Sequence, residues 1–310
     1  MMDEGEAPLE RRRLMSDLPR IVPAVVTPLS EGGERLMLDW IPQHLAYVEH
    51  RGADGVLALG TNGEGVSLSI EERQDMIDAV LTHRGRLRVM FGTGCASLPE
   101  TVALSRYAIE RGADAVLVMP PFYFKQIDPQ GIIAYYGALL DALPPERKVL
   151  LYNIPGTSGV EISDELVDAL VERFPERLLG IKDTSGQIER TRSYLQRYPQ
   201  LAIYNGSDGN VGEAVPSGVA GAISAVANVF PDLIAGVFDA HAAGGDVAAA
   251  QAEVSRVRDT LSRFPSHSAI KHLLHLVADL PLTYVRPPLR DLTPDEVEAL
   301  SRQVRELALA

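Results

Sequence analysis

The stretch RGADGV at residues 51–56 recurs as RGADAV at 111–116, and this repeat indicates the fold. In each copy the sequence predicts a helix that ends at Arg-Gly, because a glycine just past the last turn accepts the left-handed conformation that ends many helices. An apolar run follows each Ala-Asp and predicts a strand. A repeated helix-to-strand junction is typical of a chain built from βα units.

Eight short apolar runs, rich in Val, Ile and Leu, follow one another along the chain. They do not alternate with polar residues, as expected for parallel strands buried on both faces. The runs lie at 21–27, 54–60, 87–92, 113–119, 147–153, 178–182, 201–205 and 219–224. The amphipathic stretches between them that predict helices include 39–51, 70–83, 97–111 and 129–142.

Parallel neighbouring strands need helical crossovers of this kind. Eight such units in series, without a domain break, favour a (β/α)₈ TIM barrel over a doubly wound open sheet. We expect an N-terminal tail at residues 1–18 and the barrel at 19–230. Only helical patterns follow, so residues 231–310 are expected to form a C-terminal helical extension.

Composition limits the classes of function. The 310 residues carry a net charge of −13, which disfavours nonspecific binding to nucleic acid or an anionic membrane. The single cysteine allows no internal disulfide and fits a reducing compartment. The N-terminus lacks the apolar core of a signal peptide, and no apolar run reaches the roughly 18 residues of a membrane helix. We therefore expect a soluble, cytoplasmic protein.

Polar side chains gather where the predicted strands end, which is where a barrel of this kind forms its active site. The candidates are Thr27, Thr61, Asn62, Tyr123, Tyr152, Asn153, Lys182, Asn205 and Ser224. They supply one amine, two phenols and several hydroxyls, without a cluster of His, Cys or carboxylate groups. This set suits carbonyl chemistry through a Schiff base better than metal-dependent hydrolysis.

Lys182 is one of only four lysines in a chain whose usual cation is arginine. A primary amine attacks a ketone, loses water and leaves an iminium that accepts electrons, whereas a guanidinium does not. We therefore predict that Lys182 is catalytic; the alternative is a lysine that reaches solvent and pairs with an acid such as Asp183. Tyr152 could move a proton beside it, or be a core tyrosine. The glycine-rich loop at 60–65 could hold a carboxylate, or be a plain turn.

Several motifs, in this order and spacing, resemble the dihydrodipicolinate synthase and N-acetylneuraminate lyase family. They are GTNGEG (60–65), PPFYF (120–124), YNIPGTSG (152–159), GIKDTSG (180–186), SAIKHLLHL (268–276) and VRPPL (285–289). The resemblance covers about residues 19–309. The family consists of (β/α)₈ class I aldolases and related lyases that act on pyruvate or another 2-oxo acid.

The resemblance implies a role for each matching residue. Lys182 matches the Schiff-base lysine, and Tyr152 matches the tyrosine that moves protons at the substrate. Thr61 matches a hydroxyl relay, and with Asn62 it would hold the carboxylate of the 2-oxo acid. Tyr123 matches a tyrosine that often reaches into a neighbouring subunit, in a homotetramer built as a dimer of dimers. Neither a cofactor nor a metal is expected, because the covalent imine on Lys182 provides the electron sink.

Two departures point to a branch of the family. Synthases that condense pyruvate with aspartate semialdehyde carry an arginine where this chain has Thr157, and threonine offers no charge for a second carboxylate. These synthases also usually have threonine in place of Asn62. Aldolases for 2-keto-3-deoxy sugar acids or 4-hydroxy-2-oxoglutarate look more similar here. Thr157, Asn205 and Ser224 would suit a hydroxylated substrate tail, although loop capping would also explain them.

We therefore expect retro-aldol cleavage of a 2-oxo acid, such as 2-keto-3-deoxygluconate or 4-hydroxy-2-oxoglutarate, to pyruvate and an aldehyde. The alternatives are a 4-hydroxy-tetrahydrodipicolinate synthase, a sugar-acid dehydratase and a non-catalytic 2-oxo acid binding protein. Two other classes are disfavoured. GTGCAS at 92–97 lacks the third glycine of a dinucleotide-binding loop, and no carboxylate joins His267, His272 and His275 in a metal site.

Overall fold

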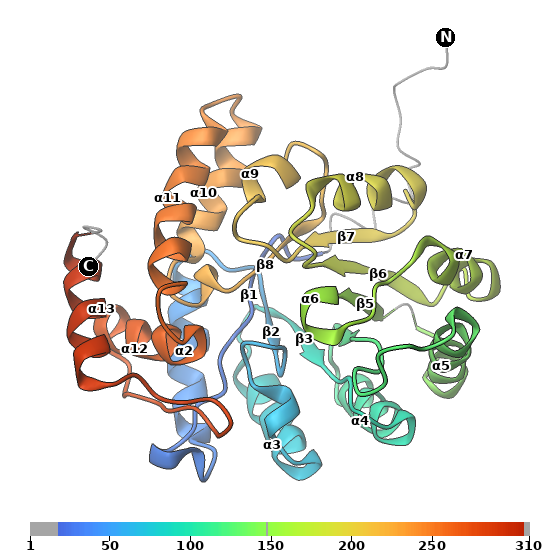
Figure 1. Cartoon of the computed structure of the whole chain (residues 1–310), viewed down its shortest axis with the longest axis horizontal. Coiled ribbons are helices and arrows are strands. Elements are labelled where there is room, and N and C mark those ends of the chain that lie inside the picture. Colours follow the sequence, from blue (N-terminus) through green and yellow to red (C-terminus); the bar gives the residue numbers. More distant parts are fainter. Residues whose placement is uncertain (1–17, 147, 307–310) are drawn as a thin grey trace.

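The fold is given by a computed structural model that describes residues 18–146 and 148–306. A sheet of eight parallel strands forms its centre (Figure 1). The strands are β1 (Ile21–Pro23), β2 (Gly55–Ala58), β3 (Arg88–Gly92), β4 (Ala115–Val118), β5 (Val149–Asn153), β6 (Leu178–Asp183), β7 (Ala202–Asn205) and β8 (Gly221–Ser224). The expected tail lies outside the described residues, except for Leu18, which packs against the barrel interior.

The sheet closes on itself. Seven neighbouring pairs run from β2 through β8 to β1, and β1 then meets β2 at a single parallel bridge between Ala24 and Leu57. At this bridge the Val25 N–H donates to the Leu57 carbonyl oxygen at 2.9 Å. This closure confirms the TIM barrel and excludes the doubly wound open sheet. One strand lies within each predicted apolar run, with β6 ending one residue beyond its run.

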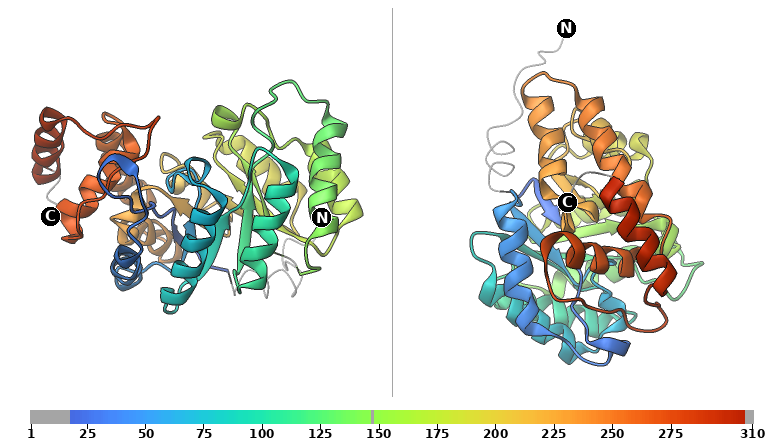
Figure 2. Two further views of the ribbon diagram at one scale, coloured as in Figure 1. Left: turned by 90° about the horizontal axis from the view of Figure 1, so that it is seen from below. Right: turned by 90° about the vertical axis from the view of Figure 1, so that its left-hand side faces the viewer.

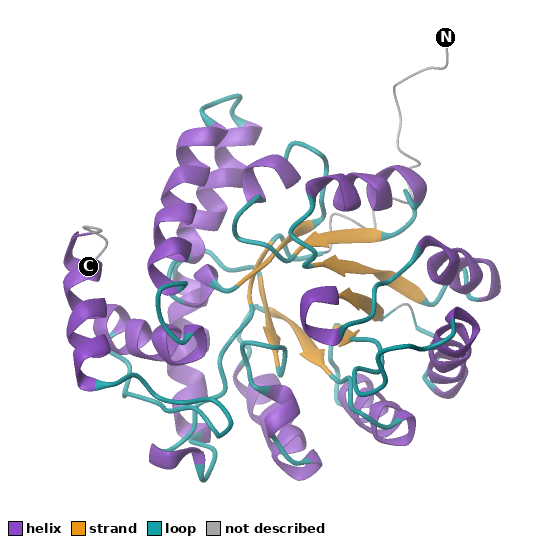
Figure 3. Ribbon diagram, viewed as in Figure 1, coloured by secondary structure: helices purple, strands orange, loops and turns teal. Residues whose placement is uncertain are grey.

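Helices surround the strands on the outside (Figure 3). Those that follow the strands are α2 (Ile41–His50), α3 (Ile70–His83), α4 (Leu98–Glu110), α5 (Pro129–Ala142), α6 (Pro155–Ser158), α7 (Asp164–Arg173), α8 (Ile188–Arg197), α9 (Val211–Ala214) and α10 (Pro231–Ala242). The chain continues through α11 (Val247–Leu261), α12 (Ser266–Ala278) and α13 (Pro294–Glu306). None of the helices in the described ranges is long and apolar enough to span a membrane.

The repeated RGAD segment forms the same junction twice. Gly52 and Gly112 follow α2 and α4 with φ values of 96° and 99°, a conformation that favours glycine. After each glycine the aspartate side chain accepts a hydrogen bond from the backbone of the neighbouring strand. The Ile21 N–H donates to Asp54 at 3.2 Å, and an N–H of β3 donates to Asp114 at 2.8 Å. The repeat therefore ties pairs of strands together at the N-terminal end of the barrel.

Two apolar layers hold the barrel. Side chains on one face of the strands fill its interior, and those on the other face pack against the helices. Interior residues include Val22, Leu57, Met90, Leu117, Leu150 and Tyr204. Burial on both faces explains why the strand segments lack polar alternation. The polar residues that end the strands are left together at the C-terminal mouth of the barrel.

The extension lies against the first part of the chain. In Figures 1 and 2 α12 lies beside α2, although the two are far apart in the sequence. The Trp40 indole N–H, just before α2, donates to the Pro281 carbonyl oxygen at 2.8 Å, after α12. The α10 helix packs directly on β1 and completes the ring of barrel helices. Because α10 begins at Pro231, the ring of barrel helices continues past residue 230. The predicted division between barrel and extension at residues 230 and 231 stays a prediction.

His44 in α2 is buried in the contact between α2 and the segment after β8. Its Nε2 lies 3.1 Å from the Asn228 carbonyl oxygen, and the Trp40 ring lies beside it. A carbonyl oxygen can only accept, so Nε2 carries the hydrogen. Burial lowers the pKa of His44 to about 4, against the partial opposing effect of the Asn228 hydrogen bond.

We expect this buried imidazole to make the fold acid-sensitive. The unfolded chain binds a proton at His44 near pH 6.5, whereas the folded chain does so only near pH 4. Stability from this group is therefore complete above pH 6.5 and falls by up to about 3 kcal/mol as the pH drops toward 4. Urea unfolding at pH 7 and pH 5 measures it. His44→Gln should be less sensitive to pH over this interval, and an equal loss in both proteins would contradict the assignment.

Candidate active site

Three predicted residues meet at the mouth of the barrel. Lys182 is the last but one residue of β6 and lies opposite Tyr152 of β5 in the strand register. The Lys182 Nζ donates to the Tyr152 hydroxyl at 3.3 Å, and that hydroxyl lies 3.3 Å from the Thr61 Oγ1. Lys182 and Tyr152 are only 4% and 5% exposed. An amine, a phenol and an aliphatic hydroxyl thus form a continuous chain that runs from the buried Lys182 and Tyr152 to Thr61, which is exposed at the mouth of the barrel.

The surroundings of Tyr152 make its phenol more acidic than an ordinary tyrosine. Burial alone would raise the pKa of Tyr152, but the positive charge of Lys182 and the hydrogen bond from Thr61 bring it below its usual value. The Lys182 Nζ also lies 4.4 Å from the centre of the Tyr152 ring, within the range of a cation–π contact. A phenol with a lowered pKa is suited to accepting and returning a proton.

Asp183 does not neutralise Lys182. Its side chain points out of the barrel, as strand alternation predicts. One oxygen accepts from Asn153 Nδ2 at 2.9 Å and from the Ser185 N–H at 3.0 Å, and the other accepts from Thr191 at 2.7 Å. The alternative in which Lys182 pairs with Asp183 is therefore wrong for this structure. The carboxylate instead braces the end of β6 against β5 and α8.

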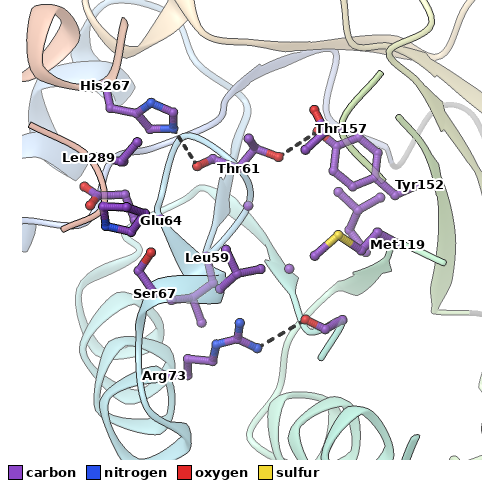
Figure 4. Close-up of a pocket in the computed structure, with 16 residues that line it drawn as sticks. Leu59, Thr61, Glu64, Ser67, Arg73, Met119, Tyr152, Thr157, His267 and Leu289 are labelled. Atoms are coloured by element: carbon purple, nitrogen blue, oxygen red, sulfur yellow. Dashed lines mark hydrogen bonds between the residues drawn. The ribbon is translucent and has the colours of Figure 1, made fainter. Parts of the chain in front are cut away.

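A cavity of about 230 Å³ opens beside this chain of groups. Its polar wall includes Thr61, Tyr152, Thr157 and His267. Its apolar wall includes Leu59, Val66, Leu117, Met119, Pro288 and Leu289. Figure 4 shows Thr61 between His267 and Tyr152, with a hydrogen bond on each side. The C-terminal extension therefore contributes directly to this cavity.

The loop that carries Thr61 is strained and closely packed. Leu59 and Glu64 have φ values of 59° and 52°, which residues other than glycine rarely adopt. Two glycines allow the backbone to approach itself here: a Cβ atom on Gly65 or Gly92 would lie 2.1 or 2.4 Å from the Leu59 carbonyl oxygen. Such a conformation persists only where surrounding contacts hold it.

The four predicted substrate-binding residues other than Thr61 have different surroundings. Thr157 is exposed and lines the cavity, whereas half-buried Asn62 does not line it. Both polar ends of the Asn205 amide bond the backbone of Ser207, at 2.9 and 3.2 Å. Ser224 is buried and its Oγ accepts from a backbone N–H at 3.0 Å. The side chains of Asn205 and Ser224 are therefore already hydrogen-bonded within their own loops. Substrate binding by all four residues stays a prediction.

Tyr123 lies apart from the other predicted catalytic residues. It follows β4 and is 75% exposed, and its ring makes an edge-to-face contact with Phe124, which is 68% exposed. Lys125 anchors this loop by donating to the Ser158 carbonyl oxygen of α6 at 3.0 Å. A single chain therefore does not bring Tyr123 to Lys182.

Two polar residues near Lys182 were not predicted. The buried hydroxyl of Thr184 makes no hydrogen bond of ordinary geometry within the described part of the chain, but it lies close enough to Tyr152 to help lower the pKa of that phenol. A Cβ on Gly206 would lie 2.0 Å from this hydroxyl, so glycine leaves it room. Asp208 accepts from two backbone N–H groups after β8, at 3.1 and 3.0 Å, and burial raises its pKa. Strand alternation from Lys182 could have identified Thr184, but no local signal identifies Asp208.

The histidines and the GTGCAS segment, which the sequence disfavoured as a metal site and a dinucleotide-binding loop, make other contacts in the structure. His267, His272 and His275 contact three separate backbone carbonyl oxygens, of Thr61, Ser268 and Leu280. Within residues 18–146 and 148–306, no group of three or more His, Cys, Asp or Glu side chains is placed to hold a metal ion. In GTGCAS, Gly92 and Gly94 line the cavity described above.

Comparisons with known proteins agree with this arrangement. The sequence model of the Dihydrodipicolinate synthetase family matches residues 17–307. An uncharacterized DapA-like lyase of Chloroflexus aurantiacus is 46% identical, over 92% of this chain and 96% of that protein. The 2-dehydro-3-deoxy-D-gluconate/2-dehydro-3-deoxy-phosphogluconate aldolase of Thermoproteus tenax is 31% identical, over 89% and 87%. The crystal structure of YagE from Escherichia coli K12 in complex with pyruvate has a TM-score of 0.86 at 27% identity, covering 95% of this chain and 100% of that one.

The fold and the site define a barrel lyase with an amine at the mouth of the barrel. The chain belongs to the dihydrodipicolinate synthetase family. Members of this family are pyruvate-dependent lyases, so the expected enzyme class is confirmed. The particular substrate is a separate question.

Proposed function

We propose that this enzyme is a Schiff-base aldolase that cleaves a 4-hydroxy-2-oxo acid, such as 2-keto-3-deoxygluconate or 4-hydroxy-2-oxoglutarate, to pyruvate and an aldehyde. The observation that carries the proposal is the chain of contacts from Lys182 through Tyr152 to Thr61, with both distances at 3.3 Å. The similarity to an aldolase for 2-dehydro-3-deoxy-D-gluconate supports the sugar acid as the first substrate to test.

In the proposed reaction, the Lys182 amine attacks the C2 carbonyl and water leaves, which forms an iminium. The Tyr152 phenolate takes the proton of the C4 hydroxyl. The C3–C4 bond breaks, its electrons pass into the iminium, and the aldehyde departs from an enamine. Tyr152 returns its proton to C3, and water hydrolyses the imine to release pyruvate. Thr61 holds the phenol in line and lowers its pKa.

Thr157 favours cleavage of a hydroxylated acid over dipicolinate synthesis. It is exposed at the wall of the cavity. A hydroxyl there bonds the neutral tail of a 2-keto-3-deoxy sugar acid more readily than a second carboxylate, whether that of aspartate semialdehyde or the far one of 4-hydroxy-2-oxoglutarate, so the sugar acid is the preferred substrate. Recognition of a second carboxylate usually relies on the two parallel hydrogen bonds of an arginine. Thr61 and Asn62 are proposed to hold the first carboxylate, and Asn205 and Ser224 to border the tail.

The proposal is tested by borohydride reduction with pyruvate, 2-keto-3-deoxygluconate or 4-hydroxy-2-oxoglutarate, followed by peptide mass mapping. A pyruvate adduct on Lys182 formed from either longer acid supports cleavage. An adduct that retains all the sugar-acid carbons and lacks one water beyond the water released in imine formation indicates a dehydratase. Turnover only with pyruvate and aspartate semialdehyde indicates the synthase. If none of the compounds forms an adduct, the remaining alternative is a non-catalytic binding protein.

We place this reaction in the cytoplasm. The single cysteine, Cys95, is buried and free, which suits a reducing compartment. The net charge of −13 opposes nonspecific association with nucleic acid.

We also propose a homotetramer, built as a dimer of dimers, in which Tyr123 reaches the cavity of a second copy. Tyr123 and Phe124 are the most exposed aromatic side chains of the described residues, and Val66 at the cavity wall is 59% exposed. Contact between copies would remove these apolar groups from water. The second copy would bring its own Tyr123 close to Tyr152.

Loss of this aromatic pair should separate the copies. Tyr123→Ala/Phe124→Ala is expected to shift the protein toward smaller species in analytical ultracentrifugation and to lower kcat by roughly 10-fold or more. Leu276→Ala, at another exposed apolar residue, serves as the control. A fully active monomer would contradict the proposal.

A further inference from the structure

A buried ion pair joins the C-terminal extension to the loop that carries Thr61. The Lys271 Nζ of α12 lies 2.6 Å from the Glu64 carboxylate, and both side chains are 0% exposed. The Lys271 Nζ also donates to the Tyr284 carbonyl oxygen, and the second Glu64 oxygen accepts from the Arg286 N–H at 2.9 Å. Burying two charges costs free energy, which is offset only where their geometry and remaining hydrogen bonds are good.

The pair lies at the strained end of the loop. Glu64 itself has the left-handed φ of 52°, and its N–H donates to the Thr61 carbonyl oxygen at 3.0 Å. The same carbonyl lies 3.0 Å from the His267 Nε2, one turn before Lys271 on α12. Two residues of α12 therefore hold the backbone on either side of the short turn from Thr61 to Glu64.

We propose that Lys271 and Glu64 are positioning residues that hold Thr61 at hydrogen-bonding distance from Tyr152. The path of contacts runs from Lys271 to Glu64, through one backbone turn to Thr61, and then to the Tyr152 hydroxyl at 3.3 Å. This inference rests on the proposed function, in which Thr61 acts through Tyr152. Glu64 lines the cavity, but its two carboxylate oxygens are bonded to Lys271 and to the Arg286 N–H, so neither Lys271 nor Glu64 is assigned a step in the reaction.

A role in stability alone would not require the contacts to converge on this turn. Arg286 already ties the extension to the start of α3 through two hydrogen bonds to Glu72, at 2.6 and 2.8 Å. The two bonds to Glu72 hold the extension on the barrel, but they do not contact Glu64 and do not fix its backbone conformation. The buried pair acts at that residue, where a left-handed backbone needs contacts that fix it.

The test uses Glu64→Gln/Lys271→Met, which removes both charges while keeping similar side-chain shapes. We expect the full chain to fold and to form the pyruvate imine on Lys182. We expect kcat for cleavage to fall by roughly 10- to 100-fold, since small displacements in a catalytic group have effects of this size. Loss of the Thr61 bond raises the pKa of Tyr152, so the acidic limb of the kcat–pH profile should move to higher pH, as in Thr61→Val. Glu64→Gln alone serves if the double variant does not fold.

Leu300→Ala is the matched control, because Leu300 is fully buried in α13 of the same extension. It should lower Tm without moving the pH profile. If the double variant keeps the wild-type kcat and pH profile while Thr61→Val is impaired, the positioning role is wrong and the proton relay through Thr61 stands. If Thr61→Val also behaves as wild type, the proton relay fails together with this inference. A shift of the profile in Leu300→Ala equal to that in the double variant would likewise overturn it.

Discussion

Replacing Lys182 with arginine is expected to lower the rate of cleavage by at least roughly 10⁴-fold, the scale of loss when a covalent nucleophile is removed. The guanidinium keeps the positive charge beside Tyr152 but cannot condense with a ketone. Because the side chain is 4% exposed and packs against Gly206, the larger head group should also crowd the site. The variant should therefore lose both turnover and the borohydride-trapped adduct.

Lys148→Arg provides the matched control for that substitution. Lys148 lies just before β5, and its Nζ donates to the Ala113 carbonyl oxygen at 2.9 Å, at the opposite end of the barrel from Lys182. This variant should keep both the adduct and turnover within about 2-fold of wild type, as expected for a substitution away from the site. An adduct that persists in Lys182→Arg, mapped to another lysine, would contradict the assigned nucleophile.

Tyr152→Phe is expected to reduce kcat by roughly 10²- to 10⁴-fold, the range attributed to a general acid or base. Phenylalanine keeps the ring that lies 4.4 Å from the Lys182 Nζ but removes the hydroxyl between Lys182 and Thr61. Pyruvate should still be trapped on Lys182, so the loss should fall on the later proton transfers. The measurement compares single-turnover cleavage with the yield of the reduced adduct.

The wild-type pH profile provides a second test of Tyr152. If its phenolate is the base, kcat rises with pH through a pKa lower than that of an ordinary tyrosine, and this limb disappears in Tyr152→Phe. Tyr204→Phe is the control, because Tyr204 is buried on β7 and its hydroxyl has no partner in the described residues. It should keep the limb, and an equal loss in both variants would argue against a specific role for Tyr152.

The sequence alone predicted the features that depend on residues close together in the chain. Strands buried on both faces leave continuous apolar runs, so the runs located all eight strands. Alternation along β6 correctly turned Lys182 inward and Asp183 outward. The prediction of Lys182 as the nucleophile rested on the scarcity of lysine, its place near a strand end and the family motif, and its catalytic role stays a prediction.

The remaining contacts depend on barrel closure, which no short stretch encodes. Thr61 and Tyr152 are 91 positions apart, and their hydroxyls meet only because β2 and β5 belong to one closed sheet. Glu64 and Lys271 are 207 positions apart, and Glu64 alone suggests no partner. Conversely, Asn205 has the residue type and place of a substrate ligand, yet its amide is used by its own turn.

The pairing of β1 with β8 has a consequence for the making of the protein. β1 leaves the ribosome first, yet its partner ends at Ser224, and Lys271 is added later still. Until those residues emerge, the nascent chain has an open sheet and an uncompensated Glu64, although Lys182 and Tyr152 are already present. Long-range pairings of this kind make folding slow. We expect the enzyme to gain activity only after Lys271 has emerged, because the barrel and the Glu64 ion pair are incomplete before then.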